Sequence, residues 1–227
     1  MEVLFLNHGE ISLAHHGVLF LDELPEFNKS VIDVLRGPLE EKFVTINRLN
    51  ASITYPCNFM LVASMNPCPC GYYGSKIRDC TCSEKQIKRY LSKISGPILD
   101  RIDIQVEVQG VTYQKLNSSA TKIETSSKIR CRVNNARKLQ IKRYKNYGIY
   151  SNSELTPMLI DKYCNLSSNC KNILQSAFEK LGLSARAYTR ILKVARTIAD
   201  LDNSEEIKIQ HISEAIQYRN LDRKYWN

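Results

Sequence analysis

Two adjacent carboxylates follow a short apolar run near the start of the printed sequence. The run is Val18–Leu21, and the carboxylates are Asp22 and Glu23. The run is too short for a helix, and its unbroken apolar character predicts a strand buried on both faces of a parallel sheet. Carboxylates at the carboxyl end of such a strand lie in the crevice where open α/β sheets bind ligands.

This pair has the chemistry that nucleotide hydrolysis requires. One carboxylate holds Mg²⁺ and the other polarises the attacking water, which is the Walker B arrangement. Asp22 is then the magnesium ligand and Glu23 the candidate base. The alternative is a structural strand that happens to end in acidic residues, and these residues by themselves leave both interpretations open.

The elements expected around the pair alternate between helices and strands. In order, we expect a helix over 29–39, a hairpin over 43–47 and 52–55, a strand over 58–63, a helix over 83–94 and a strand over 102–108. The strand over 58–63 leads to Asn66, and Ser83 is suited to cap the helix that it precedes. This order predicts an α/β fold.

The second half of the chain has a different pattern. Residues 112–127 are polar and rich in Ser and Thr, which is typical of a linker. Beyond them we expect only helices, over 128–145, 155–163, 168–181, 185–200 and 209–218. The sequence therefore predicts a domain over 1–111, a linker over 112–127 and a helical domain over 128–227.

The composition narrows the class of protein. The chain has 227 residues and a net charge of +9, which favours a polyanionic partner such as nucleic acid. The apolar run at the start is too short and lacks the basic flank of a signal peptide, and no segment is long enough to span a membrane. Eight cysteines in such a chain indicate reduced thiols or a metal site. We therefore expect a cytoplasmic protein with no membrane partner.

Four of these cysteines form two close pairs in the segment 67–82. Cys68 and Cys70 are separated by one residue, and so are Cys80 and Cys82. Two thiolate pairs on one loop suit tetrahedral Zn²⁺, although Cys-x-x-Cys is the commoner spacing in structural zinc sites. Unmetallated thiols are the alternative. The remaining cysteines have no such spacing and are interpreted as packing or surface residues.

A basic segment begins after the predicted linker. Residues 126–153 contain no acidic residue. Ile129, Val133 and Ala136 predict an apolar stripe on a helix whose outer face is cationic. Interleaved tyrosines are a feature of single-strand binders, but a charge run is more often a solvated helix face. The basic side chains are Lys128, Arg130, Arg132, Arg137, Lys138, Lys142, Arg143 and Lys145.

Several blocks in the same order as in a known family extend over essentially the whole chain. They are Gly9–His15, Asp22–Phe27, Arg36–Glu40, Ala63–Gly71, Ser95–Asp103, Ser184–Ala187 and Ala195–Leu201. On these residues the chain resembles the magnesium-chelatase-like AAA+ ATPases of the ComM/YifB group. The resemblance implies a partial AAA+ P-loop NTPase core, from Walker B to the arginine finger, followed by an all-α lid.

The resemblance also implies roles for individual residues around ATP and Mg²⁺. Asn66 is expected to be sensor 1, whose amide orients the lytic water. Arg101 is expected to be the arginine finger that reaches a neighbouring subunit's nucleotide. Arg186 is expected to be sensor 2 on the lid, and Arg190, one turn further on, is the weaker candidate. The alternatives are a turn-forming Asn66, a salt bridge between Arg101 and a neighbouring aspartate, and solvated helix charges.

Related ring ATPases project hairpins into a central pore, and this analogy makes the hairpin the better DNA candidate. Lys42 and Arg48 would then contact phosphates of single-stranded or branched DNA. The family assembles into rings, and a hexamer is the expected form of the full-length protein.

One element of the family pattern is absent. AAA+ hydrolysis needs a Gly-x-x-x-x-Gly-Lys-Ser/Thr loop around the phosphates, and none of the nine glycines here precedes a lysine. We therefore expect that the N-terminal half of the ATPase core, and the Lon-protease-like domain upstream of it, are missing. Their loss would leave unpaired sheet edges and exposed apolar faces, so the chain alone should bind ATP poorly and associate.

The sequence thus predicts the C-terminal part of an ATP-driven ring motor acting on DNA, of the helicase or branch-migration type. One alternative is a truncated, catalytically inactive binding or assembly module whose cysteine loop is stabilised by zinc. Another is a chelatase-type motor that remodels a partner protein, which the basic charge and the cysteine-loop match disfavour.

Overall fold

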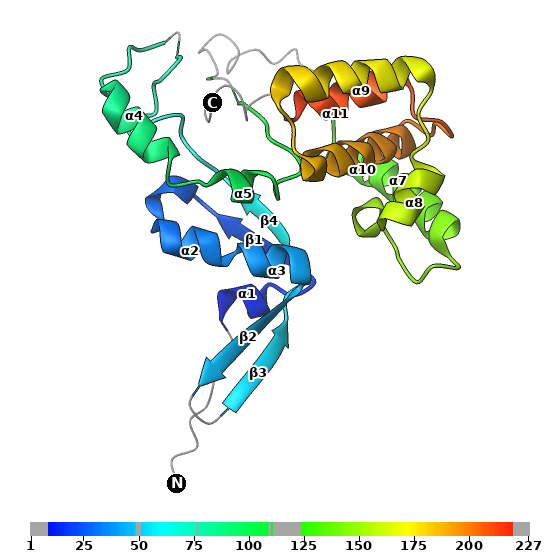
Figure 1. Ribbon diagram of the computed structural model, residues 1–227, viewed down its shortest axis with the longest axis horizontal. Coiled ribbons are helices and arrows are strands. Elements are labelled where there is room, and N and C mark those ends of the chain that lie inside the picture. Colours follow the sequence, from blue (N-terminus) through cyan, green and yellow to red (C-terminus); the bar gives the residue numbers. More distant parts are fainter. Residues whose placement is uncertain (1–8, 49–50, 76, 109, 111–123, 220–227) are drawn as a thin grey trace. The chain divides into compact units, whose positions relative to one another are not determined.

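The computed structural model describes residues 9–48, 51–75, 77–108, 110 and 124–219. The chain divides into two compact units, and the division falls between Ile102 and Asp103. The first unit is mixed α/β, and the second contains helices (Figure 1). The sequence pattern predicts a division further on, at the polar linker over 112–127, of which residues 112–123 lie outside the described part.

A pair of parallel strands forms the centre of the first unit. Strand β1 (Val18–Leu21) pairs with β4 (Met60–Ala63) over their whole length, from Val18 opposite Met60 to Leu21 opposite Ala63. Both predicted strands are confirmed, and their parallel order places their carboxyl ends at the same edge (Figure 1). Within the described residues this sheet has two strands.

The two faces of this sheet differ. Leu19 and Leu21 pack against a core of Leu24, Ile32, Leu35, Ile94, Ile98 and Leu99. On the other face Val18, Phe20 and Met60 are 58%, 59% and 63% exposed. The prediction of strands buried on both faces is therefore wrong for this chain, because no described segment covers the second face. The exposed apolar face itself was expected.

Short helices surround the strands. Helix α1 (Glu10–Leu13) precedes β1, and the 3₁₀ turn η1 (Leu24–Glu26) follows it. The predicted helix over 29–39 is instead two helices, α2 (Lys29–Val34) and α3 (Arg36–Glu41). Pro38 explains the break, because it has no N–H to donate to the carbonyl of Val34 in a continuous helix.

The predicted hairpin is confirmed. Strand β2 (Phe43–Arg48) pairs in antiparallel register with β3 (Ala51–Pro56), and Phe43 lies opposite Pro56. A hydroxyl contact of 2.9 Å between Thr45 and Thr54 joins the strands. The tip, residues 49–50, and the side chain of Arg48 lie outside the described residues.

Helix α4 (Glu84–Leu91) begins at a capping box, in which the Ser83 hydroxyl accepts the Gln86 N–H and Gln86 accepts the Ser83 N–H. Helix α5 (Gly96–Leu99) follows it. The predicted strand over 102–108 is wrong, since these residues have no regular structure. The Gln105 N–H donates instead to the Tyr218 carbonyl at 3.0 Å, and no described strand pairs with the segment.

The second unit is a helical bundle, in agreement with the expectation for this half. Its elements are α7 (Ser126–Tyr144), η2 (Asn152–Glu154), α8 (Pro157–Tyr163), α9 (Ser168–Leu181), α10 (Ala185–Leu201) and α11 (Ile209–Gln217). Helix α10 packs against α7, α8 and α11, and supplies Ala187, Ile191 and Ala195 to the core. Among the described helices, none is both long and apolar enough to cross a bilayer.

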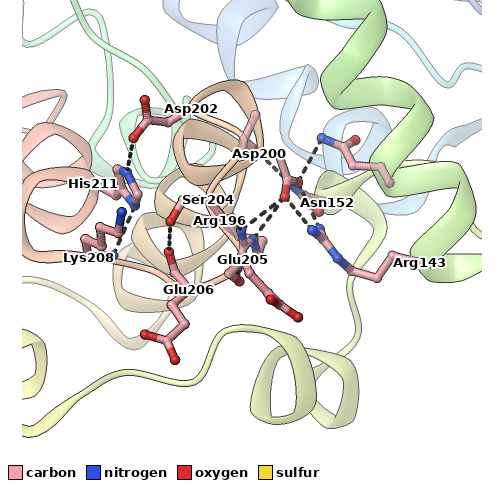
Figure 2. Close-up of polar contacts among 12 residues, drawn as sticks. Arg143, Asn152, Arg196, Asp200, Asp202, Ser204, Glu205, Glu206, Lys208 and His211 are labelled. Carbon is pink, nitrogen blue, oxygen red and sulfur yellow. Dashed lines mark hydrogen bonds and ion pairs between the residues drawn. The ribbon is translucent and has the colours of Figure 1, made fainter.

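A buried carboxylate organises the centre of this bundle. Asp200 on α10 accepts hydrogen bonds from both Arg143 Nη atoms at 2.9 and 2.5 Å, and from Asn152 at 2.8 Å (Figure 2). Arg196 approaches the same carboxylate at 3.1 Å. One basic residue of the predicted cationic face, Arg143, is therefore an internal structural group.

The apolar stripe of α7 is only partly covered. Ala136, Gln140 and Tyr144 are buried, but Ile129 and Val133 on the same stripe are 42% and 44% exposed. Of the three residues of the predicted stripe, Ala136 is therefore buried, whereas Ile129 and Val133 are not covered by described residues. In the described residues, the bundle reaches only the C-terminal half of α7.

Candidate active site

The two carboxylates lie on an exposed and sharply turned segment. Glu23 follows β1 with φ 50° and ψ 51°, a left-handed conformation that is uncommon for a residue other than glycine. Such strain persists where the surroundings enforce it, and it often accompanies functional sites. Both Asp22 and Glu23 are exposed to solvent, so a ligand can reach them.

Ser64, directly after β4, ties the ends of the two strands together. Its hydroxyl donates to the Asp22 carboxylate and accepts the Glu23 N–H, the latter at 3.0 Å. Its carbonyl accepts the Leu24 N–H at 2.9 Å. Ser64 therefore holds Asp22 in place and stabilises the unusual backbone of Glu23. It lies in a block that matches the family, but sequence reasoning gave it no role.

Asn66 lies two residues beyond Ser64, at the same edge of the sheet, and is exposed. The Asn66 backbone N–H faces the hydroxyl oxygen of Tyr90 on α4, a contact that by itself lowers the pKa of this phenol. Burial raises the pKa of Tyr90, and the charges of Glu26 and Glu23 act in the same direction, so this phenol faces the carboxylate edge. Sequence reasoning missed Tyr90, because the pairing of α4 with this edge is not a local pattern.

Arg101 points into the first unit. Its side chain is 6% exposed, and its Nη2 lies 2.8 Å from a Glu40 carboxylate oxygen. Its Nη1 donates to the Pro97 carbonyl at 2.5 Å, and its Nε has no hydrogen-bond partner among the described residues. The acidic partner is thus Glu40, not the neighbouring aspartates considered from the sequence. A role toward another subunit requires this guanidinium to leave Glu40.

The two lid arginines lie on the first turns of α10, which Ser184 caps by accepting the Ala187 N–H at 3.1 Å. Arg186 is exposed, and Arg190 forms an ion pair with Asp103. These residues belong to the second unit, and the carboxylate edge belongs to the first.

The hairpin candidate Lys42 is exposed and ends α3 in a left-handed conformation, with φ 61°. This conformation turns the chain from the helix into β2. The position of Lys42 at the base of the hairpin is thus described, whereas the Arg48 side chain is not.

The four cysteines of segment 67–82 gather as their spacing predicted. All four Sγ atoms lie within 4.8 Å of one another, so the donor set can hold a metal ion. The hydrogen bond from the Tyr72 backbone lowers the pKa of Cys70, whereas the neighbouring sulfurs of Cys68 and Cys70 contribute to raising the pKa of Cys80 and Cys82 when no metal is bound. The other four cysteines lie elsewhere, with Cys57, Cys164 and Cys170 buried and Cys131 exposed.

Comparison with known proteins identifies the two halves. Residues 4–116 match the family "Magnesium chelatase, subunit ChlI", and residues 123–219 match "Magnesium chelatase, subunit ChlI C-terminal". The chain is similar to competence protein ComM of Haemophilus influenzae, with 46% identity over 95% of this chain and 41% of that protein. It is similar to YifB of Escherichia coli, with 45% identity and the same coverage of both proteins.

A shorter similarity, 32% identity over 62 residues, extends to the magnesium-chelatase 67 kDa subunit of Chlorobaculum parvum. It covers 27% of this chain and 10% of that protein. The chain spans about two fifths of the length of the ComM and YifB relatives that it matches, 41% in each case. These comparisons show that the chain belongs to the ComM/YifB-type magnesium-chelatase-like family of AAA+-type ATPases.

Proposed function

We propose that this chain is the Walker B, sensor and lid part of an ATP-hydrolysing AAA+ motor. The observation that carries the proposal is the shared edge of β1 and β4, where Ser64 joins Asp22 to the Glu23 backbone and Asn66 follows two residues later. In this assignment Asp22 holds the Mg²⁺ of ATP, Glu23 accepts a proton from the attacking water, and Asn66 orients that water.

The arginines complete the pocket in a ring of subunits. Arg101 neutralises charge on a neighbour's nucleotide after it leaves Glu40, and Arg186, as sensor 2 on the lid, contacts the γ-phosphate. Arg190 is the weaker lid candidate because Asp103 already engages it. The upstream part, which supplies the Gly-Lys-Ser/Thr loop in this family, and a ring of several copies are the partners that this scheme requires.

The proposed substrate is DNA in the cytoplasm, unwound or branch-migrated by the ring. The net charge of +9 supports a polyanionic partner, and the similarity to a competence protein supports DNA as that partner. Lys42 and Arg48 on the hairpin are the proposed phosphate contacts, and their loss should weaken binding and reduce its salt dependence.

A chimera tests this function. In this chimera, the chain replaces the matching part of the Haemophilus influenzae relative, which supplies its own upstream part. Mg²⁺-dependent ATP hydrolysis is then measured with and without DNA. We expect DNA-stimulated hydrolysis in the chimera that Asp22→Asn abolishes, and none in the chain alone. Asp79→Asn, in the cysteine loop, is the matched control. A folded, ring-forming chimera without hydrolysis would contradict the proposal.

An inactive assembly module is the second candidate, and the inward position of Arg101 favours it. A guanidinium that is 6% exposed and paired with Glu40 serves the first unit as a structural group. This candidate predicts that the chimera assembles but does not hydrolyse ATP, with or without DNA.

A further inference from the structure

We propose that Cys68, Cys70, Cys80 and Cys82 bind one Zn²⁺, which fixes the loop 67–82 against Asn66. Its metal content can be measured apart from ATP hydrolysis, because none of its ligands belongs to the carboxylate edge. The proposal therefore stands or falls separately from the motor function.

The sulfur positions match one tetrahedral ion. Four sulfurs around zinc, each at about 2.3 Å, stand about 3.8 Å from one another. Here the Sγ atom of Cys68 lies 3.3 Å from that of Cys70 and 3.6 Å from that of Cys80, and the Cys70–Cys80 separation is 3.5 Å. Disulfide sulfurs are about 2.05 Å apart, so these separations fit a shared ion and not a covalent bond.

The donor set and its surroundings suit zinc. Four thiolates in tetrahedral order suit Zn²⁺, and a set of sulfurs all within 4.8 Å surrounds one ion more readily than a multi-iron cluster. The Tyr73 N–H points at the Cys68 sulfur at 3.3 Å, as outer-shell donors do at thiolate ligands. Cys68 is buried, whereas the other three ligands are partly exposed, which leaves a path for the ion to enter.

The position of the ligands in the chain explains what the ion would do. Cys68 follows Asn66 by two residues, and Cys82 directly precedes Ser83, the cap of α4. One ion therefore closes the irregular loop that joins Asn66 to α4. Gly71 has φ 80° and lies against Asn66, since a Cβ added at Gly71 would be 3.8 Å from the Asn66 Oδ1. The loop therefore passes close to the Asn66 side chain, and an ion that closes the loop would fix it there.

Metal analysis of the full chain, purified without chelator, tests the site. We expect about one zinc per chain, which Cys80→Ser together with Cys82→Ser removes. Cys131→Ser, at the exposed cysteine on α7, is the matched control and should retain the zinc. Cys82→His should retain it as well, because an imidazole can replace a thiolate as ligand.

Two further measurements remain decisive if the serine variant does not fold. Cobalt substituted for zinc in the unmodified chain should give the thiolate charge-transfer and intense visible bands of a tetrahedral sulfur site. Removal of zinc by a chelator should accelerate amide exchange over 67–91 and leave exchange in α9 and α10 unchanged.

Iron in place of zinc, or a metal-free chain that takes up neither zinc nor cobalt, would overturn the assignment. Zinc retained by the double serine variant would do the same. Unchanged exchange over 67–91 after zinc removal would refute the role of the ion in fixing the loop.

Discussion

Replacing Asp200 by asparagine should strongly destabilise the helical unit. This carboxylate is fully buried and faces the guanidinium groups of Arg143 and Arg196, whose side chains are 19% and 3% exposed. Asp200→Asn keeps the shape of the side chain but leaves both cations without their shared anion. Breaking a buried ion pair on one side costs about 3–5 kcal/mol.

The lower end of that range applies, because Arg143 can reach water after the change whereas Arg196 cannot. We therefore expect a loss of about 3 kcal/mol, since only one of the two cations stays buried and unpaired. For a unit of this size each kcal/mol lowers the melting temperature by about 4–8 °C, so a decrease of about 12–24 °C is expected.

Differential scanning calorimetry of the whole chain measures this change, because it separates the melting of two units. Asp161→Asn, at an exposed aspartate on α8, is the matched control and should melt within about 4 °C of the parent, as about 0.5 kcal/mol or less is expected there. A shift for Asp200→Asn that is no larger than the control's would refute the argument from the buried network. The family block Ala195–Leu201 would then need another explanation.

Three further predictions concern the first unit. Glu40→Gln should lower the free energy of unfolding of this unit by about 2 kcal/mol, because Arg101 keeps only its bond to Pro97. The value lies between those for surface and for buried ion pairs. An unchanged midpoint of urea unfolding would contradict this prediction. Phe20→Thr with Met60→Thr should weaken self-association at least about tenfold in analytical ultracentrifugation, since tenfold corresponds to only 1.4 kcal/mol. If the double variant associates as strongly as the parent chain, the exposed face of β1 and β4 is not the surface through which the chains associate. Ser83→Ala should cost about 1 kcal/mol of α4 stability, measured by amide exchange, and unaltered exchange would rule out the capping box as a determinant.

Local patterns were sufficient for most elements. The unbroken apolar runs predicted β1 and β4, and two short β-like runs close together in the sequence predicted the hairpin β2–β3. The helices of the second unit follow from their apolar spacing. In each case, the information lies within the segment itself, because side-chain periodicity and caps are properties of neighbouring residues.

Two of the differences from the predictions have a common cause, because no described segment pairs with or covers the residues concerned. Ile102–Val108 has the alternation of a strand, but a strand forms only where another strand accepts its hydrogen bonds, and no described strand does so. Ile129 and Val133 likewise have the spacing of a packing face, but no described residues cover them. The break in the helix over 29–39 was different, since Pro38 was visible in the sequence and was not used.

The candidate site was predictable in part. The carboxylates and the cysteine pairs were found from residue types and spacing, and the comparisons confirm the family that the resemblance indicated. Ser64, Tyr90 and Glu40 were missed because each acts across the fold, on a residue that lies 24 to 61 positions away (Asn66 for Tyr90, Arg101 for Glu40). Such contacts depend on the tertiary structure and leave no periodic signal.

The central claim is that Glu23 acts on water next to a magnesium-bound nucleotide. The most direct test compares ATP binding with single-turnover hydrolysis in the chimera carrying Glu23→Gln. Because a positioned base contributes about 10²–10⁴-fold, we predict a loss of hydrolysis of at least about 100-fold with nearly unchanged ATP affinity. Hydrolysis at the parent rate, with ATP still bound, would contradict the account.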